Sequence, residues 1–173
     1  MNDLRFKYFD KDNFNVQCSE FLRAVRSHPD IVANVFHSKK ITRVEQEYWY
    51  ENDYSKNIDW KIYIIYDQNL NCPIGYVNLN IDSILHRRCQ FDYQVSPEFF
   101  YRKYDKRIIK WAINNSMKIE IEMHRLWCYV FPEYAKKINI LSGMNFEIDG
   151  IIRDYIYKDG MYRNVYIMSK LLS

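Results

Sequence analysis

The sequence predicts a mixed α/β fold, in one domain spanning residues 1–173, with helices on both faces of a single sheet. Strand-like runs and helical stretches follow one another in the order β-α-α-β-β-β-α-β-α-β-β. No linker, internal repeat or low-complexity tract divides the chain. Its 173 residues are enough to bury a core without disulfides or metals.

The first strand and helix occupy the N-terminal 30 residues. Leu4 to Phe9 alternates in the manner of a strand, and a polar turn follows. From Gln17 to Arg26 the apolar residues recur every three or four positions, which predicts one buried helix face. Pro29 ends this helix.

A second helix is expected to begin at Thr42. Glu45 follows three residues later, so the pair predicts a capping box. Val44, Tyr48 and Trp49 would form the inner stripe of this helix.

The middle of the chain predicts three strands and the longest helix. Trp60 to Tyr66 and Ile74 to Ile81 are rich in β-branched and aromatic residues and are joined by polar turn residues, which predicts a hairpin. Arg88 to Val95 is the next strand, and a helical pattern extends from Phe100 to Ile121.

The C-terminal third predicts a strand, a helix and a hairpin. Arg125 to Val130 is the strand, and Glu133 to Leu141 is the helix. Glu147 to Tyr157 and Met161 to Leu171 form the hairpin around an Asp-Gly turn.

Composition excludes several classes of protein. The net charge of +3 is spread along the chain, which argues against a dedicated nucleic-acid binder. The four cysteines are far apart and no histidine stands at metal-ligand spacing, so we expect reduced, mostly buried thiols and no metal. Because no apolar run approaches membrane-spanning length and no signal segment is visible, we expect a soluble, cytoplasmic protein without a membrane partner.

The C-terminal segment resembles the last third of the GNAT N-acetyltransferases. Residues 130–153, VFPEYAKKINILSGMNFEIDGIIR, and 159–171, DGMYRNVYIMSKL, are similar to the pattern V-x-x-x-N-x-x-A-I-x-L-Y-E-K-x-G-F-x-x-E-G, then R, then D-G-x-Y-x-D-x-x-x-M-x-x-L. The element order also agrees with that fold. The resemblance implies a mostly antiparallel, twisted sheet of about seven strands with a V-shaped splay between the fourth and fifth strands. It also implies direct acetyl transfer from acetyl-CoA in a ternary complex, without an acetyl-enzyme.

The resemblance assigns a coenzyme site to two segments. The backbone of Tyr93, Gln94 and Val95 would hold the pantetheine arm. The pyrophosphate turn, Q/R-x-x-G-x-G/A in the family, falls on a segment without glycine. The coenzyme-binding candidates there are Tyr101, Arg102, Lys103, Tyr104, Asp105, Lys106 and Arg107, and Lys136 on the later helix Glu133 to Leu141 is a further one. Their cations would replace part of the missing backbone contact, although such a run of charges is also typical of a solvated helix end.

The general acid departs from the family pattern. The tyrosine that protonates the departing thiolate falls at Leu141, which cannot donate a proton. Tyr134 is one candidate replacement, and a thiolate also leaves with little help because the thiol pKa is only about 8.5.

The general base is equally open. The resemblance places groups that hold a water at Asn78 and Tyr129, which are too weakly basic to act alone. A water relay to bulk solvent or to Asp92 or Glu133 would take the amine proton.

The acceptor is predicted from a shorter motif. Val25-R-S-H-P29 with Phe36 resembles the start of the subgroup that acetylates nucleotide-linked amino sugars, the pseudaminic acid type of glycan biosynthesis. This implies a UDP-4-amino-4,6-dideoxyhexose acceptor, with Arg26 on the diphosphate. The other substrate-binding candidates are His37, Asn80 and His86. A protein N-terminal or ribosomal-protein acetyltransferase and a non-catalytic binding module remain alternatives, and a homodimer is possible.

Overall fold

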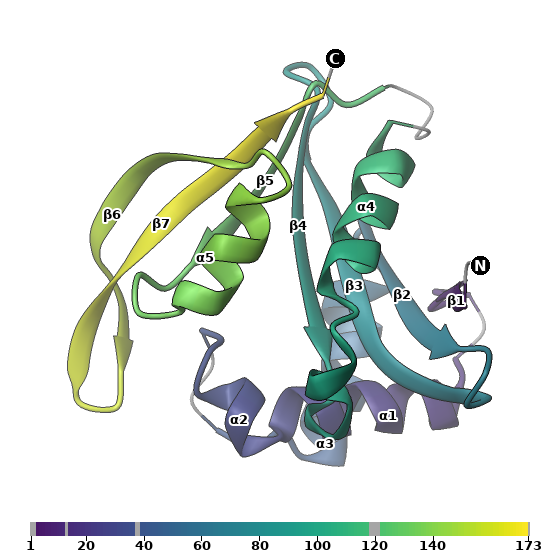
Figure 1. Cartoon of the computed structure of the whole chain (residues 1–173). Helices are drawn as coiled ribbons and strands as arrows, with labels where there is room; N and C mark the ends of the chain where they lie inside the picture. The colour runs from purple at the N-terminus through teal and green to yellow at the C-terminus, as the bar shows by residue number, and fades with distance from the viewer. Residues whose placement is uncertain (1–2, 13, 37–38, 118–121, 173) are drawn as a thin grey trace.

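The computed structural model describes residues 3–12, 14–36, 39–117 and 122–172 (Figure 1). Seven strands form one sheet in the order β1-β2-β3-β4-β5-β7-β6, and all neighbours are antiparallel except β4 and β5. The strands are β1 Leu4–Tyr8, β2 Trp60–Asp67, β3 Cys72–Ser83, β4 Arg88–Val95, β5 Arg125–Val130, β6 Glu147–Lys158 and β7 Met161–Leu171. The predicted mixed, mostly antiparallel sheet is therefore confirmed.

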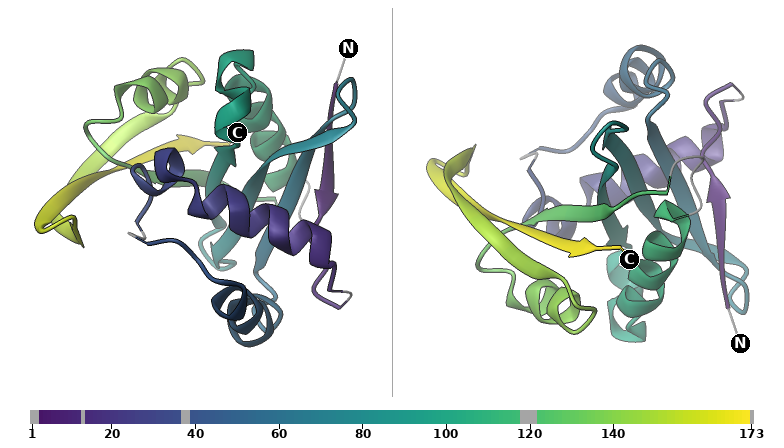
Figure 2. Two further views of the ribbon diagram at one scale, coloured as in Figure 1. Left: turned by 90° about the horizontal axis from the view of Figure 1, so that it is seen from below. Right: turned by 90° about the horizontal axis from the view of Figure 1, so that it is seen from above.

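Helices cover both faces of this sheet (Figure 1, Figure 2). The helical segments are α1 Val16–Ser27, α2 Pro29–Val32, α3 Arg43–Trp49, the π-helical η1 Tyr50–Tyr54, the 3-10 helix η2 Pro97–Arg102, α4 Asp105–Ser116 and α5 Ala135–Ser142. Alternation along β2 separates two cores: Ile62 and Ile64 pack with α1, while Ile65 packs in the cluster that contains α4 and α5.

The splay predicted between the fourth and fifth strands is present. The parallel ladder of β4 and β5 has three pairs and ends at Gln90↔Trp127. Beyond that point β5 stays paired with β7 and β4 with β3, so the two strands diverge (Figure 1). The β5-facing peptide groups of the last β4 residues therefore face an opening rather than a neighbouring strand.

Two helices differ from the sequence-based expectation. The predicted helix from Phe100 to Ile121 is interrupted, because Lys103 has a left-handed backbone (φ 54°, ψ 46°) between η2 and α4. Residues 118–121 lie outside the described residues. In α3 the predicted capping box is present and Trp49 of the predicted inner stripe packs against the core. Val44 and Tyr48 are 75% and 65% exposed and the buried residue is Gln46, so the stripe is wrong for those two residues.

The remaining expectations concern thiols and long apolar helices. All four cysteines are free, and Cys18, Cys89 and Cys128 are buried while Cys72 is half-buried. Within the described part of the chain, no helix has the length and apolar character needed to cross a membrane.

Candidate active site

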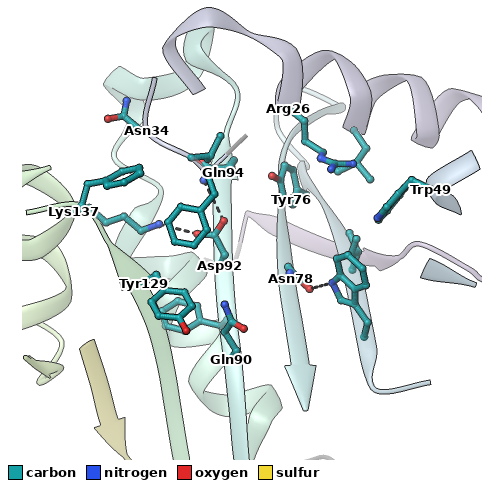
Figure 3. A pocket seen from close by; sticks show the side chains of 17 residues that line it. Arg26, Asn34, Trp49, Tyr76, Asn78, Gln90, Asp92, Gln94, Tyr129 and Lys137 are labelled. Carbon is teal, nitrogen blue, oxygen red and sulfur yellow. Dashed lines mark hydrogen bonds and ion pairs between the residues drawn. The ribbon is translucent and has the colours of Figure 1, made fainter. Parts of the chain in front are cut away.

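Two hollows on opposite faces of the sheet meet at the splay. The larger is a cavity of about 240 Å³ on the face covered by α1 (Figure 3). Its walls are mostly aromatic and its floor is polar. The aromatic residues are Phe36, Trp49, Trp60, Tyr76, Phe91, Tyr129 and Phe131, and the polar ones are Arg26, Asn34, Asn78, Gln90, Asp92, Gln94 and Lys137.

The smaller hollow lies on the other face, between β4, α5 and the start of α4. It is lined by Tyr93, Gln94, Val95, Asp105, Tyr134, Lys136, Lys137 and Ile140. Gln94 and Lys137 line both hollows. The splay thus brings two separate spaces to one point, which is what a reaction between two bound molecules requires.

An ion pair occupies that meeting point. Lys137 Nζ lies 2.8 Å from Asp92 Oδ1, and the ammonium is 5.1 Å from the centre of the Tyr93 ring. Gln94 Nε2 donates to the other carboxylate oxygen at 3.3 Å. Burial alone would lower the pKa of Lys137, but the neighbouring Asp92 charge holds that pKa above its ordinary value.

The position of β4 depends on the close approach of β3 to its backbone at Gly75. Phe91, Tyr93 and Val95 point into the core, so the alternate residues Asp92 and Gln94 face the cavity. Opposite them, an ideal Cβ on Gly75 would lie 2.2 Å from the carbonyl oxygen of Gln94. Only glycine permits this spacing of β3 and β4 beside the splay.

The predicted catalytic residues divide between the two hollows. Asn78 and Tyr129 both line the larger cavity, where the Trp60 indole donates to Asn78 and the hydroxyls of Tyr129 and Tyr155 are 3.3 Å apart. Burial and the Tyr155 hydroxyl raise the pKa of Tyr129 to about 12, so it cannot serve as a base near neutrality. Tyr134 lies instead in the smaller hollow, and burial raises its pKa.

Three residues of the predicted phosphate turn have other partners. Tyr104 is buried and its hydroxyl donates to the buried Asp67 carboxylate. Asp105 accepts a hydrogen bond of 3.0 Å from the Tyr93 hydroxyl, and Arg107 contacts Asp3 at 3.3 Å. The side chains of Tyr104 and Asp105 therefore do not serve as phosphate ligands in this arrangement, which corrects the expectation for them.

The other cations of the turn remain at the surface. Arg102, Lys103 and Lys106 are exposed around the start of α4, and among the described residues no side-chain hydrogen bond caps that helix end. Arg102 lies over the exposed Tyr101 ring at 5.5 Å. Lys136, also exposed, lies 5.7 Å from the Phe100 ring at the edge of the smaller hollow.

The predicted acceptor residues are only partly brought together. Arg26 lines the larger cavity, donates to Gln46 at 3.2 Å and stacks on the Trp49 ring at 4.8 Å. Asn80 does not line the cavity, and His86 is exposed in the turn before the paired end of β4, away from the splay. Placement in that turn removes His86 from the acceptor site. His37 lies outside the described residues.

Sequence reasoning missed Lys137. It is one of two adjacent lysines on an amphipathic helix, and the sequence does not say which one faces the splay. The available signal was its spacing: Lys137 precedes Leu141 by four residues, one helical turn from the position of the family tyrosine. Leu141 itself is fully buried in the core.

Comparison with known proteins identifies relatives of one enzyme class. No family model matches the chain. The spermidine N(1)-acetyltransferase of Escherichia coli K12 is 25% identical over 130 residues, 68% of each chain. The Vibrio cholerae spermidine N(1)-acetyltransferase is 23% identical over 142 residues, 75% of this chain and 81% of the relative. An uncharacterised N-acetyltransferase of Bacillus subtilis, YoaA, is 24% identical over 87 residues, about half of each chain.

Solved structures extend the similarity to the whole chain. The crystal structure of spermidine N-acetyltransferase from Vibrio cholerae, in complex with CoA and spermine, superposes with a TM-score of 0.87 at 19% identity and covers 99% of this chain and 97% of its own. The predicted GNAT fold is confirmed, and the named relatives bear out the predicted class of enzyme, an N-acetyltransferase. Two of these relatives are named for spermidine, the name of the third gives no substrate, and none of the three names a nucleotide-linked sugar.

Proposed function

We propose that this chain is an acetyl-CoA-dependent N-acetyltransferase that acetylates a primary amine of a small molecule. The observation that carries the proposal is the meeting of two hollows at the splay, where Gln94 and Lys137 line both. The thioester would enter from the smaller hollow and the amine from the larger cavity. Direct attack then needs no acetyl-enzyme, because both reactants reach the same point.

The coenzyme would follow β4 toward the start of α4. Backbone N–H groups of Tyr93 to Val95 on the open side of β4 would polarise the thioester carbonyl, as hydrogen-bond donors aimed at developing charge do. Arg102, Lys103 and Lys106 would attract the pyrophosphate at the uncapped helix N-terminus. Lys136, at the edge of the hollow, is a further candidate for a phosphate.

The candidates for the amine acceptor are a polyamine and a nucleotide-linked amino sugar. The names of the relatives favour a polyamine, and the aromatic walls can bind an alkylammonium through cation–π contacts. The nucleotide-linked amino sugar is the second candidate, because Arg26 places a guanidinium in the same cavity, where it can bind a phosphate. The described lining residues include one carboxylate, Asp92, and it is already paired with Lys137.

The experiment is a two-step assay. Calorimetry with acetyl-CoA measures coenzyme binding, and free-thiol release then measures turnover with spermidine, spermine, UDP- and dTDP-linked 4-amino sugars and N-terminal peptides. Turnover on one small amine identifies the acceptor. Turnover on peptides alone moves the chain to the protein-acetylating alternative, and failure to bind acetyl-CoA leaves only the non-catalytic module and refutes the proposal.

The single domain and the homodimer also remain proposals. The β6–β7 hairpin exposes several large apolar side chains, which are Ile148, Ile151, Tyr155, Tyr157, Met161, Tyr162 and Leu171. A surface of this kind is typical of an interface between subunits, and a spermidine N-acetyltransferase of Vibrio cholerae has been solved as a dodecamer. Sedimentation velocity would give the oligomeric state directly.

A further inference from the structure

The acid of the proposed reaction is missing from its family position. Leu141 stands where the resemblance expects a tyrosine, and its side chain is fully buried among apolar residues. One turn earlier on the same helix, Lys137 extends an ammonium through the splay instead (Figure 3). A proton-carrying group is therefore present, although its chemistry differs from that of a tyrosine.

The ion pair is placed asymmetrically across the splay. Asp92 projects into the larger cavity from β4 and its side chain is 35% exposed. Lys137 comes from α5, lines both hollows and has a side chain only 11% exposed. The carboxylate thus faces the side where an amine would arrive, and the ammonium faces the side where a thioester would lie.

We propose that Asp92 and Lys137 act as one acid–base couple on the reacting atoms, Asp92 taking the proton of the attacking amine and Lys137 stabilising the departing thiolate. The inference rests on the proposed function and deepens it. It gives the ion pair a role in both halves of the transfer and replaces the tyrosine that is absent at position 141.

The step balances in atoms and in charge. The neutral amine forms a C–N bond to the acetyl carbon, its proton passes to the Asp92 carboxylate, and the C–S bond breaks with its electron pair on sulfur. Before the step the site holds one carboxylate and one ammonium. After it, the site holds a neutral carboxylic acid, one ammonium and one thiolate. The net charge stays at zero, so no unpaired charge is created in a poorly solvated space, where it would be costly.

Asp92 and Lys137 return to their starting charges when Asp92 passes its proton to the CoA thiolate. The protonated Asp92 can make this transfer because a carboxylic acid is ordinarily a much stronger acid than a thiol. The products are the amide and CoA with a free thiol, and the couple returns to its starting charges. An acceptor that arrives as an ammonium must first lose one proton to solvent.

Other titratable groups face the couple. They are Tyr76, Tyr93, Tyr129, Tyr134 and Cys128, together with Arg26 and with Asp105, which accepts a hydrogen bond from Tyr93. Burial raises the pKa of each of the four tyrosines and raises that of Cys128 to about 12, so these groups stay neutral near pH 7. Asp105 lines the smaller hollow only, whereas Asp92 lines the larger cavity in contact with Lys137.

A titration of bound CoA tests the couple without turnover. The ultraviolet absorbance of the thiolate gives the pKa of the CoA thiol in the wild type, Asp92→Asn and Lys137→Met proteins. Asparagine imitates the protonated Asp92 and leaves the ammonium for the thiolate, so this variant should give the lowest thiol pKa. Lys137→Met should give the highest, with a difference of about 1–3 units between the variants. Equal values in all three proteins would overturn the proposal.

Kinetics provide the second test. Asp92→Asn and Lys137→Met should each lower kcat about 100-fold or more, while the Kd for acetyl-CoA changes less than about threefold. The double variant, which leaves neither charge unpaired, should be folded but no slower than the worse single variant, since the two residues act as a unit. Lys137→Arg should recover much of the loss, and Lys7→Met on β1 is the control for losing one lysine charge at an exposed site away from the splay.

The outcomes separate the two proposals. A wild type that acetylates a small amine while Lys137→Met keeps its kcat would refute the couple and leave the proposed function intact. A double variant that recovers wild-type kcat would show that the pair is only structural and also refutes the couple. A wild type that binds no acetyl-CoA refutes both.

Discussion

Gly75→Ala should damage both stability and catalysis, because the added methyl meets backbone. The Cβ would lie 2.2 Å from the Gln94 carbonyl oxygen and 3.0 Å from Val95 Cα, while real contacts stay above 3.0 Å. The strands must therefore separate by at least about 0.8 Å, the difference between 3.0 and 2.2 Å. Overpacking of this kind costs about 1–3 kcal/mol, from which the better strand propensity of alanine recovers about 0.5–1 kcal/mol.

The net loss, at most about 2.5 kcal/mol, corresponds to a fall in Tm of up to about 10 °C for a chain of this length. Gln94 lines both hollows, so its displacement should also lower kcat about 100-fold, as misplacement by about 1 Å does. Thermal unfolding and the thiol-release assay measure the two effects.

Gly150→Ala is the matched control for this change. A Cβ on Gly150 would meet no atom within 4 Å, so this variant should keep the wild-type Tm and kcat. If Gly75→Ala behaves like Gly150→Ala in both measurements, the close approach of β3 and β4 does not position the splay and the reasoning fails.

Three further predictions concern the loop before α4. Lys103→Gly should raise the free energy of unfolding by about 0.5–1 kcal/mol in a denaturant titration, because glycine adopts the left-handed backbone without strain, and a loss would contradict this. Tyr104→Phe should cost about 1–3 kcal/mol at pH 7 by removing a donor to buried Asp67. The Tyr104 hydroxyl lowers the pKa of Asp67, so this contribution to stability is present above about pH 4 and is lost as the pH falls through the pKa of Asp67 in the folded state. The free energies of unfolding of the wild type and the variant should therefore converge in acid. A constant difference between them down to pH 2 would refute the assignment. Arg102→Gln with Lys106→Gln should weaken acetyl-CoA binding about tenfold by calorimetry and reduce its salt dependence, whereas unchanged binding at low salt would exclude these cations from the phosphate site.

The sheet was predictable because its signals are local. The strands Arg125–Val130 and Met161–Leu171 agree with the predicted bounds. Arg125–Val130 alternates between half-buried and buried residues, and Met161–Leu171 begins directly after the Asp-Gly turn. The start of α4 was not predictable in the same way. The segment between η2 and α4 contains Lys103 in a left-handed conformation, which a lysine does not favour. Tertiary contacts such as the hydrogen bond from Tyr104 to Asp67 hold the chain there.

Most of the correctly predicted cavity residues are fixed by a strand, and Arg26 on α1 is the exception. Asn78, Tyr129 and Gln94 follow from their places on β3, β5 and β4, and all three line the cavity. The loop histidine His86 could not be placed, because the length of a turn does not say which end of the sheet it occupies. To place Lys137 at the site, one must know how α5 is oriented about its own axis against the splay. That orientation depends on long-range packing rather than on the amphipathic pattern of the helix.

Cations stand near the positions where this chain departs from the GNAT pattern, and another lines the acceptor cavity. Lys106 occupies the second glycine position of the phosphate turn and Lys103 precedes the first, Lys137 extends into the splay near the missing tyrosine, and Arg26 lines the acceptor cavity. A polyanionic coenzyme is attracted by such charges, whereas a polyamine is repelled by each one that it approaches. Spermidine could therefore present one terminal amine to Asp92 only if its remaining charges stay in solvent beyond the aromatic walls, and its KM should fall as salt screens the repulsion. A nucleotide-linked amino sugar should show the opposite salt dependence, because its diphosphate would gain from Arg26 what a polyamine loses.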